Sequence, residues 1–164
     1  MTETDEFWMR EAIFAAVEAE QLDEVPIGAC LVDSEGNLLA TAGNRTITNS
    51  DPTAHAEILA LREAASTIGN YRLTGATVYS TIEPCAMCAG ALVNARVKRL
   101  VYGAKDERFG AVETHFKICD SDFLNHKIEI VSGILAEDCR ALMQNFFRRK
   151  REIQKSNTFI DNPT

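Results

Sequence analysis

Residues 76–104, "ATVYSTIEPCAMCAGALVNARVKRLVYGA", decide the fold of this chain. They begin with a run of β-branched and aromatic residues at 76–82, which is typical of a buried strand. Small, helix-compatible residues follow at 85–95, and a second apolar run follows at 97–104. A strand, a helix and a strand in this order predict a βαβ unit, with its two strands parallel in one sheet.

The flanking segments extend this unit into an α/β domain. The apolar runs at 27–33 and 37–43 flank a short Gly-containing turn and predict an antiparallel hairpin. A further run at 127–133 predicts a last strand, so we expect a central mixed sheet of five strands with helices on both faces. Amphipathic segments predict three more helices, at 4–21, 53–67 and 136–154.

Bulk composition favours a single compact domain. The chain has 164 residues, of which 46% are hydrophobic, and no repeat or Pro/Gly-rich linker divides it. We therefore expect one domain over residues 1–164, with 152–164 as a frayed tail. No run approaches the roughly 20 apolar residues of a membrane span, and the acidic N-terminus is unlike a signal peptide. These features predict a cytoplasmic protein without membrane contact.

Charge is distributed unevenly along the chain. The net charge of −7 disfavours a polyanionic partner. Residues 1–63 carry 13 acidic and 3 basic side chains, whereas residues 64–164 carry 11 acidic and 14 basic ones. An electropositive surface, if the protein has one, must therefore come from the second part of the chain.

Cys85 and Cys88 lie three residues apart on the first turn of the helix in the βαβ unit. Their thiols share one helix face near the positive end of its dipole, which lowers their pKa. Such a pair can serve redox chemistry, a structural zinc site or a catalytic zinc site. The five cysteines are an odd number, which disfavours a disulfide framework, and the remaining three are expected to be small buried hydrophobes: Cys30, Cys119 and Cys139.

His55 and Glu57, in "TAHAE" at 53–57, favour the catalytic zinc site. Two thiolates and one imidazole are three zinc ligands, which leave the fourth position open to water, whereas a structural site needs four. No other cysteine or histidine pair has recognisable ligand spacing. Because two thiolates neutralise the charge of Zn²⁺, a carboxylate is needed beside the water, and Glu57 is expected to be that base.

"HAE" and "PCAMC" together form the pattern H-x-E…P-C-x-x-C of zinc-dependent nucleobase deaminases, which is itself a recognised example of this chemistry. The chain resembles the cytidine deaminase superfamily. Within it, "EPCAMCAGA", "LNH" and the basic "FFRRKR" resemble the tRNA adenosine deaminases, over residues from about 7 to about 150. The resemblance implies a cytidine-deaminase-like α/β/α fold, one zinc ion per subunit and a homodimer.

The resemblance also implies a reaction. Zinc-activated water, with Glu57 moving the protons, attacks C6 of the wobble adenosine in the anticodon loop of an arginine tRNA, releasing ammonia and leaving inosine. An unstacked loop base fits this chemistry, since a helix would hide C6. The basic residues at 148–151, together with Lys105 and Arg108, are candidates for phosphate contacts, although a solvated basic helix end explains charge at this position equally well.

The resemblance further implies five substrate-binding residues, each of which also has an ordinary structural explanation. An asparagine after a strand is often a turn residue, and an aspartate after "GAK" is often a loop residue. A departure from the family, "ETHFKICD" at 113–120, bears on substrate choice, because Glu113 and His115 stand where many members have small residues. The five candidates are Asn44, Asp106, Asn125, Phe147 and Arg151.

Two other functions remain open from the sequence. One is a deaminase of a free nucleobase or nucleoside such as guanine or cytosine, which shares the zinc motif but commonly lacks the basic aromatic tail. The other is a non-catalytic, zinc-stabilised RNA-binding module. Glu57 favours an enzyme, since a module without turnover has no need of a base beside the metal.

Overall fold

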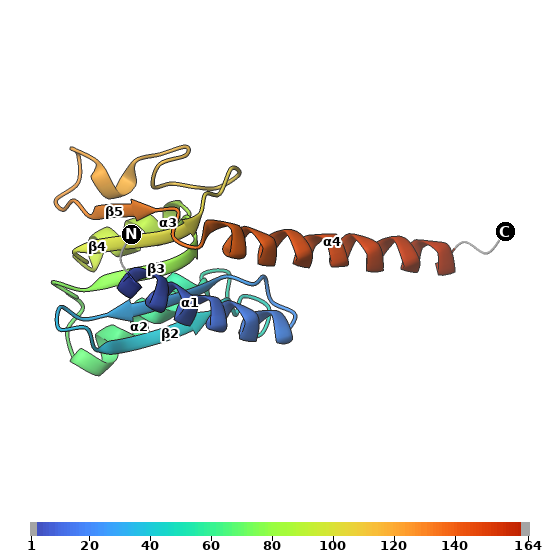
Figure 1. The fold of residues 1–164 in the computed structure, drawn as a ribbon, viewed down its shortest axis with the longest axis horizontal. Coiled ribbons are helices and arrows are strands. Elements are labelled where there is room, and N and C mark those ends of the chain that lie inside the picture. Colours follow the sequence, from blue (N-terminus) through green and yellow to red (C-terminus); the bar gives the residue numbers. More distant parts are fainter. Residues whose placement is uncertain (1–2, 162–164) are drawn as a thin grey trace.

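The computed structural model describes residues 3–161, and their strands form one five-stranded mixed sheet in the order β2-β1-β3-β4-β5 (Figure 1). The expected fold class, α/β with a central mixed sheet, is confirmed. The strands are β1 (Gly28–Val32), β2 (Leu38–Gly43), β3 (Thr77–Ile82), β4 (Arg99–Ala104) and β5 (Glu129–Ser132). The helices are α1 (Glu3–Gln21), α2 (Ala56–Ile68), α3 (Ala86–Asn94), the 3₁₀ turn η1 (Ile118–Asp120) and α4 (Ala136–Asp161).

Strand pairing follows the sequence patterns. β1 pairs antiparallel with both β2 and β3, while β3, β4 and β5 are parallel to one another. The predicted hairpin and βαβ unit are therefore both present. In the hairpin turn, Asp33 Oδ1 accepts hydrogen bonds from the backbone N–H groups of Glu35 and Asn37, each at 2.8 Å. This local network sets the connection between β1 and β2.

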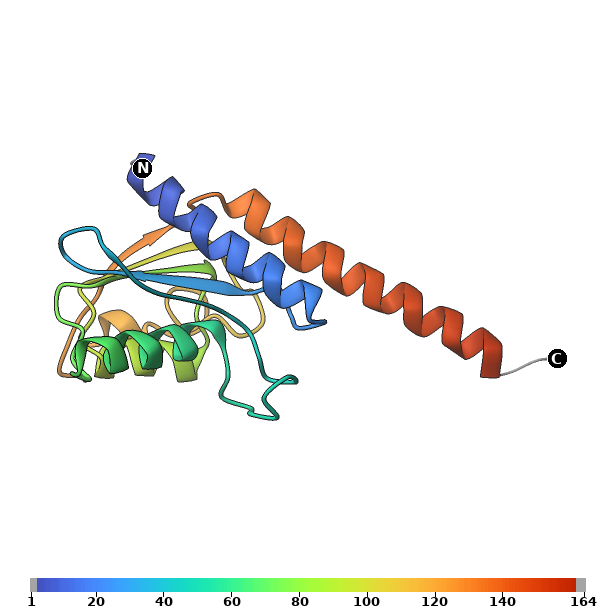
Figure 2. The same ribbon diagram turned by 90° about the horizontal axis from the view of Figure 1, so that it is seen from below.

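Two helical layers cover the sheet (Figure 2). α1 and α4 lie side by side on one face, and α2 and α3 cover the other. Successive residues of a strand point to opposite faces of the sheet, so alternate residues pack into the hydrophobic cores on its two faces. Leu31, Val78 and Leu100 point to the α2/α3 side, and their chain neighbours Cys30, Tyr79 and Val101 point to the α1/α4 side.

α1 lies very close to the sheet because small residues face one another there. Ala12 and Ala16 are fully buried, and a Cβ atom on Gly28 would overlap the backbone of Ala12. Glycine is therefore required at position 28 for helix and strand to approach this closely.

α4 is longer than the sequence analysis expected. It continues to Asp161 and extends well beyond the sheet (Figure 1), so residues 152–161, which were expected to belong to a frayed tail, are helical. The physical reason is that no proline or glycine interrupts residues 136–161. Residues 162–164, the rest of that expected tail, lie outside the described residues. No helix within 3–161 has the length and apolar character needed to cross a membrane.

Three segments that follow strands meet at one edge of the sheet. β2, β3 and β4 run in the same direction, so the residues after Gly43, Ile82 and Ala104 emerge at a common edge. The N-termini of α2 and α3 begin there as well. This edge is where most of the candidate functional residues gather.

Candidate metal centre and active-site cavity

His55 is the N-cap residue of α2, with extended backbone angles of φ −73° and ψ 152°. The helix was expected to begin at Thr53, but Asp51 Oδ1 accepts hydrogen bonds from the N–H and the hydroxyl of Thr53, at 2.8 and 2.7 Å. This turn holds residues 51–53 outside the helix. The imidazole of His55 therefore sits at the helix tip, where it can reach the loop before α3.

Cys85 is the N-cap of α3, and Cys88 follows on its first turn. His55 Nδ1 lies 3.6 Å from Cys85 Sγ and 3.5 Å from Cys88 Sγ, and the three ligand atoms all lie within 4.8 Å of one another. Tetrahedral zinc with N and S ligands at its usual bond lengths places these atoms about 3.5 Å apart. The three residues that the sequence predicted as ligands thus fit a zinc ion.

The two thiols share a proton unequally. A hydrogen bond from Cys88, reinforced by His55, lowers the pKa of Cys85 to about 4. The pKa of Cys88 is raised by its hydrogen bond with Cys85, by burial and by the nearby carboxylate of Glu57. A pair coupled in this way loses its remaining proton when a cation neutralises the sulfurs.

Glu57 lies in the first turn of α2 and is buried, with 4% of its surface exposed. Its Oε2 lies 3.5 Å from Cys88 Sγ, and its Oε1 accepts a hydrogen bond from Ser80 Oγ at 3.2 Å. Burial is the main reason why the pKa of Glu57 is raised. A carboxyl group with a raised pKa beside three metal ligands is suited to receiving and returning protons.

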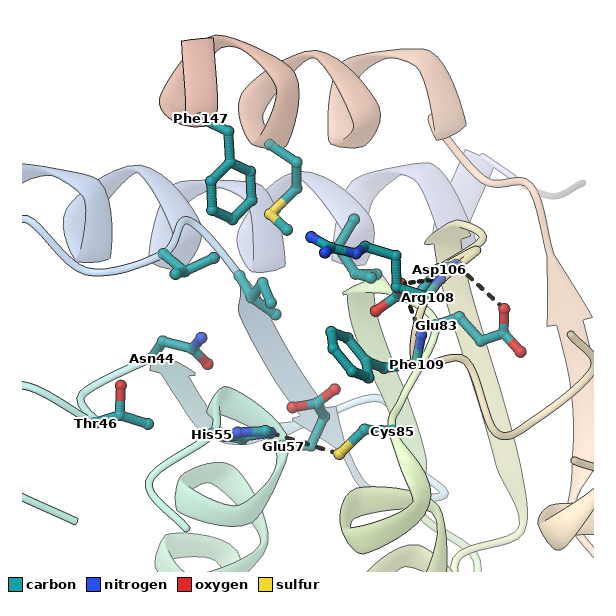
Figure 3. Close-up of a pocket in the computed structure, with 14 residues that line it drawn as sticks. Asn44, Thr46, His55, Glu57, Glu83, Cys85, Asp106, Arg108, Phe109 and Phe147 are labelled. Carbon is teal, nitrogen blue, oxygen red and sulfur yellow. Dashed lines mark hydrogen bonds between the residues drawn. The ribbon is translucent and has the colours of Figure 1, made fainter. Parts of the chain in front are cut away.

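A cavity of about 460 Å³ opens above these residues (Figure 3). This volume is within the usual range of small-ligand pockets. His55, Glu57 and Cys85 line its floor, and Phe147 of α4 points into it from above. The walls are mostly apolar and comprise Val25, Ile27, Ile82, Phe109 and Met143, together with Asn44, Thr46, Glu83, Asp106 and Arg108.

Asn44 and Asp106, two of the five predicted substrate residues, line this cavity and are also tied to the protein. Asn44 Oδ1 accepts a hydrogen bond from Ala56 N at 2.9 Å, which turns its amide nitrogen toward the cavity. Asp106 Oδ1 accepts from the N–H groups of Arg108 and Phe109, at 2.9 and 3.1 Å. Each side chain therefore has a structural role in addition to its place in the cavity wall.

Phe147 also lines the cavity, whereas Asn125 and Arg151 do not. Asn125 is exposed on the loop that enters the N-terminal end of β5, while the cavity lies beyond the C-terminal ends of β3 and β4. Arg151 is exposed one turn beyond Phe147 on the same face of α4. Phe147 is 40% exposed, whereas its neighbour Phe146 is buried.

Several residues of the site were missed by the sequence analysis. Phe109 lines the cavity with 66% of its surface exposed, and Met143 joins it from α4. Glu83 is buried and receives several hydrogen bonds from the loop after β4. The only local signal for Glu83 was a carboxylate directly before Pro84 and the first thiol.

The segment that departs from the family packs against the sheet. Glu113 accepts a short hydrogen bond from the hydroxyl of Tyr102, and a ring nitrogen of His115 lies 2.7 Å from the carbonyl oxygen of Glu107. Both residues therefore hold the loop in place. All five cysteines are free thiols, and the three outside the cluster are buried as expected: Cys30, Cys119 and Cys139.

Comparison with known proteins agrees with this geometry. Residues 2–104 match the family model of the cytidine and deoxycytidylate deaminase zinc-binding region. The chain therefore belongs to the cytidine and deoxycytidylate deaminase family, whose members are zinc-binding enzymes, and zinc is its cofactor.

Relatives within this family are more specific. A tRNA-specific adenosine deaminase of Haemophilus influenzae is 49% identical over 94% of this chain and 89% of the relative. One of Bacillus subtilis is 45% identical over 93% of this chain and 94% of the relative. The predicted resemblance to tRNA adenosine deaminases is thus confirmed.

Solved structures give the same pattern. A chain from work on A-to-I editing by tRNA:A34 deaminases at the wobble position superposes with a TM-score of 0.80, at 42% identity over 83% of this chain and 98% of the other. A guanine deaminase of Bacillus subtilis superposes with a TM-score of 0.61, at 30% identity over 91% of this chain and 95% of the other. The tRNA-deaminase structure is the more similar of these two.

Proposed function

We propose that this protein deaminates the wobble adenosine of a tRNA anticodon loop, in an arginine tRNA, to inosine. The main observation in its support is that the buried carboxylate of Glu57 lies beside three metal-ligand atoms on the floor of a base-sized cavity. Relatives named tRNA-specific adenosine deaminase support this substrate over a free base.

Zinc held by His55 Nδ1 and the sulfurs of Cys85 and Cys88 supplies, when bound, a polarised water for attack on C6 of adenine. Glu57 takes a proton from the attacking water at its carboxylate and passes it to N1 of the ring. It then carries a second proton, from the hydroxyl group added at C6, to the departing amine, which leaves as ammonia. The raised pKa of Glu57 supports both transfers, because the carboxyl group can hold a proton between them.

Other groups of the cavity orient the base. The amide nitrogen of Asn44 can donate a hydrogen bond to an adenine ring nitrogen, because its oxygen is already held by Ala56. Backbone N–H groups at the start of α3, around Cys85, can stabilise negative charge that develops on the attacking oxygen. The apolar side chains of Ile27, Ile82 and Met143 exclude water from the reacting atoms.

In this proposal, residues at and around the rim of the cavity bind the RNA. Phe147 stacks on a loop base, since it points into the cavity and remains 40% exposed. Asp106 contacts the ribose of the target nucleotide, and Arg151 contacts backbone phosphate. Asn125 contacts a nucleotide outside the cavity, since it is exposed on a loop away from this pocket.

We also propose that the protein is a homodimer. Exposed apolar side chains border the metal centre, among them Met87 on α3 and Phe116 after the 105–115 loop, at 36% and 61% exposure. Small residues at exposed or half-buried positions of α3, Ala86 and Gly90, allow another helix to approach. Sedimentation of the protein and of Phe116→Glu tests this, and a monomer in the unsubstituted protein overturns it.

The test of the function is a substrate panel. The zinc-loaded protein is incubated separately with an arginine anticodon stem-loop, free adenosine, guanine and cytosine, and ammonia and inosine are measured. We expect deamination of the stem-loop only, at its wobble position. Turnover of a free base with the stem-loop untouched would make the protein a nucleobase deaminase. Binding of the stem-loop without any turnover would make it an RNA-binding module.

A further inference from the structure

We propose that Glu83 is a positioning residue that docks the loop 105–115 onto the end of β3, so that the loop forms the wall of the cavity. The consequence for substrate binding rests on the proposed function, whereas the docking itself does not. Glu83 directly precedes Pro84 and lies at the edge of the sheet where β3 ends.

The carboxylate of Glu83 receives five hydrogen bonds from this one loop. Its Oε1 accepts from the backbone N–H groups of Val112, Glu113 and Thr114, at 3.1, 2.8 and 2.9 Å. Its Oε2 accepts from Thr114 Oγ1 at 2.5 Å and from Asp106 N at 3.2 Å. Donors from both ends of the loop therefore converge on one side chain that is 2% exposed.

Such a set of contacts is stronger than the same number of surface hydrogen bonds. Hydrogen bonds to a charged group contribute more than neutral ones, and a buried carboxylate without partners is highly unfavourable. The loop and the carboxylate thus depend on each other. If the loop leaves, Glu83 loses all five of these hydrogen-bond donors.

Gly110 shows that the fit is tight. A Cβ atom at this position would overlap the Glu83 carboxylate and would come within 2.6 Å of the Asp106 carbonyl oxygen. The absence of a side chain allows the loop to wrap around the anion. Two further contacts fix its direction: Ala111 N donates to Pro84 O at 2.9 Å, and Tyr102 donates to Glu113.

The docked loop carries three residues of the cavity wall, Asp106, Arg108 and Phe109. Figure 3 shows the carboxylate of Glu83 directed toward the backbone of Asp106 and away from Cys85. Glu83 is therefore not a second proton carrier, because its oxygens are occupied by donors of the loop. It acts on the substrate only through the residues that the loop presents.

Hydrogen exchange tests the docking directly. In Glu83→Gln, the new amide nitrogen cannot accept a hydrogen bond, so at least one group of donors loses its partner. Because the glutamine oxygen can replace only one of the two carboxylate oxygens, we expect the amide of Asp106, the amides of residues 112–114 or both to exchange about tenfold faster or more, while those of α2 and α3 are unchanged. Thr114→Val removes one donor without touching Glu83 and gives a smaller increase at the same amides, and Thr114→Ser restores protection.

Kinetics with the anticodon stem-loop separates positioning from general stability. A misplaced cavity wall raises KM, about tenfold, with kcat changed by less than about threefold and zinc content unchanged. A variant that is merely partly unfolded would instead lose kcat in proportion to its inactive fraction at constant KM.

Exchange at both Asp106 and 112–114 equal to that of the unsubstituted protein overturns the proposal, as does a uniform loss of protection that includes α2 and α3. If Glu83→Gln does not fold, Thr114→Val decides by the same criterion. If the unsubstituted protein deaminates no stem-loop, the proposed function fails, and the exchange data still decide whether Glu83 holds the loop.

Discussion

Arg149 on α4 and Glu20 on α1 form an ion pair, with 2.8 Å between Arg149 Nη2 and Glu20 Oε1. The neighbouring pair, Lys150 with Asp23, has a separation of 2.6 Å. Two of the four consecutive basic residues on α4 thus bind this helix to the end of α1 and to the turn that follows it. RNA would have to compete with these carboxylates for both cations, so we expect Arg151 to be the more important phosphate contact.

The first prediction separates these two roles. Arg151→Ala should weaken binding of the stem-loop and reduce the slope of log affinity against log salt by about 0.7–1, the effect of losing one phosphate contact. Arg149→Ala should change that slope less and should lower stability by no more than about 1 kcal/mol, as for an exposed ion pair. Binding titrations at several salt concentrations measure both variants, and equal slopes for the two would contradict this assignment.

A second prediction concerns the metal ligands. Cys88→Ala should lower zinc affinity by more than about 100-fold, because a direct ligand is removed. Loss of a residue that only hydrogen-bonds to a ligand lowers affinity by no more than about 100-fold. Cys119→Ala is the matched control, since Cys119 is also fully buried but lies outside the cluster. Zinc per chain is measured after dialysis against a chelator. If the two variants retain equal amounts of zinc, Cys88 is not a zinc ligand.

Glu24 gives a third prediction, on acid stability. It is fully buried and accepts hydrogen bonds from Thr48 N at 2.6 Å and Thr48 Oγ1 at 3.0 Å. Burial raises its pKa, but the hydrogen bonds from Thr48, Ile47 and Thr46 together outweigh this, and the pKa lies below its ordinary value of 4.5. A carboxyl group with a lowered pKa stabilises the fold fully above pH 4.5, and this contribution is lost as pH falls through the folded pKa.

Glu24→Gln should therefore lower the free energy of unfolding at pH 7, by about 1–3 kcal/mol, and should flatten its decline below pH 4.5. Denaturant unfolding at a series of pH values is the measurement. The control is Glu35→Gln, at an exposed turn position. A decline with acid as steep as in the unsubstituted protein would exclude Glu24 as its source.

Local patterns explain why the metal centre could be predicted from the sequence. His55 and Glu57 are two residues apart, Cys85 and Cys88 are three residues apart on one helical turn, and the βαβ pattern brings both pairs to one edge of the sheet. The residues that hold the surrounding loops could not be predicted this way. Glu83 and Glu24 contact partners more than 20 positions away, and nothing in their neighbours' sequence indicates those partners.

Charge pairing between distant helices was unpredictable for the same reason. The sequence alone predicts an exposed basic surface at 148–151. Only the structure shows that α1 and α4 lie together and that two of these residues form ion pairs. The sequence analysis ended α4 at residue 154, although the residues that follow, such as Lys155, are compatible with a helix. Asn125 shows that a short motif does not by itself place a residue at the cavity.

A fourth prediction concerns Phe109, an exposed aromatic residue in the cavity wall. Phe109→Ala should weaken stem-loop binding by about 1–3 kcal/mol if its ring stacks on a base, and Phe109→Trp should retain binding. Phe123→Ala is the control, because Phe123 is 97% exposed on a loop outside the cavity. Binding is measured by fluorescence anisotropy of a labelled stem-loop. Equal affinities for the two alanine variants would remove Phe109 from the binding surface.

The most direct test is the effect of Glu57→Gln on inosine formation at the wobble position, with zinc content measured on the same samples. Loss of the proton carrier should lower kcat by about 10²–10⁴-fold with zinc per chain unchanged, while Glu63→Gln, on the exposed side of the same helix, remains active. Undiminished inosine formation by the zinc-loaded Glu57→Gln variant would contradict the central claim that this buried carboxylate moves the protons beside the metal.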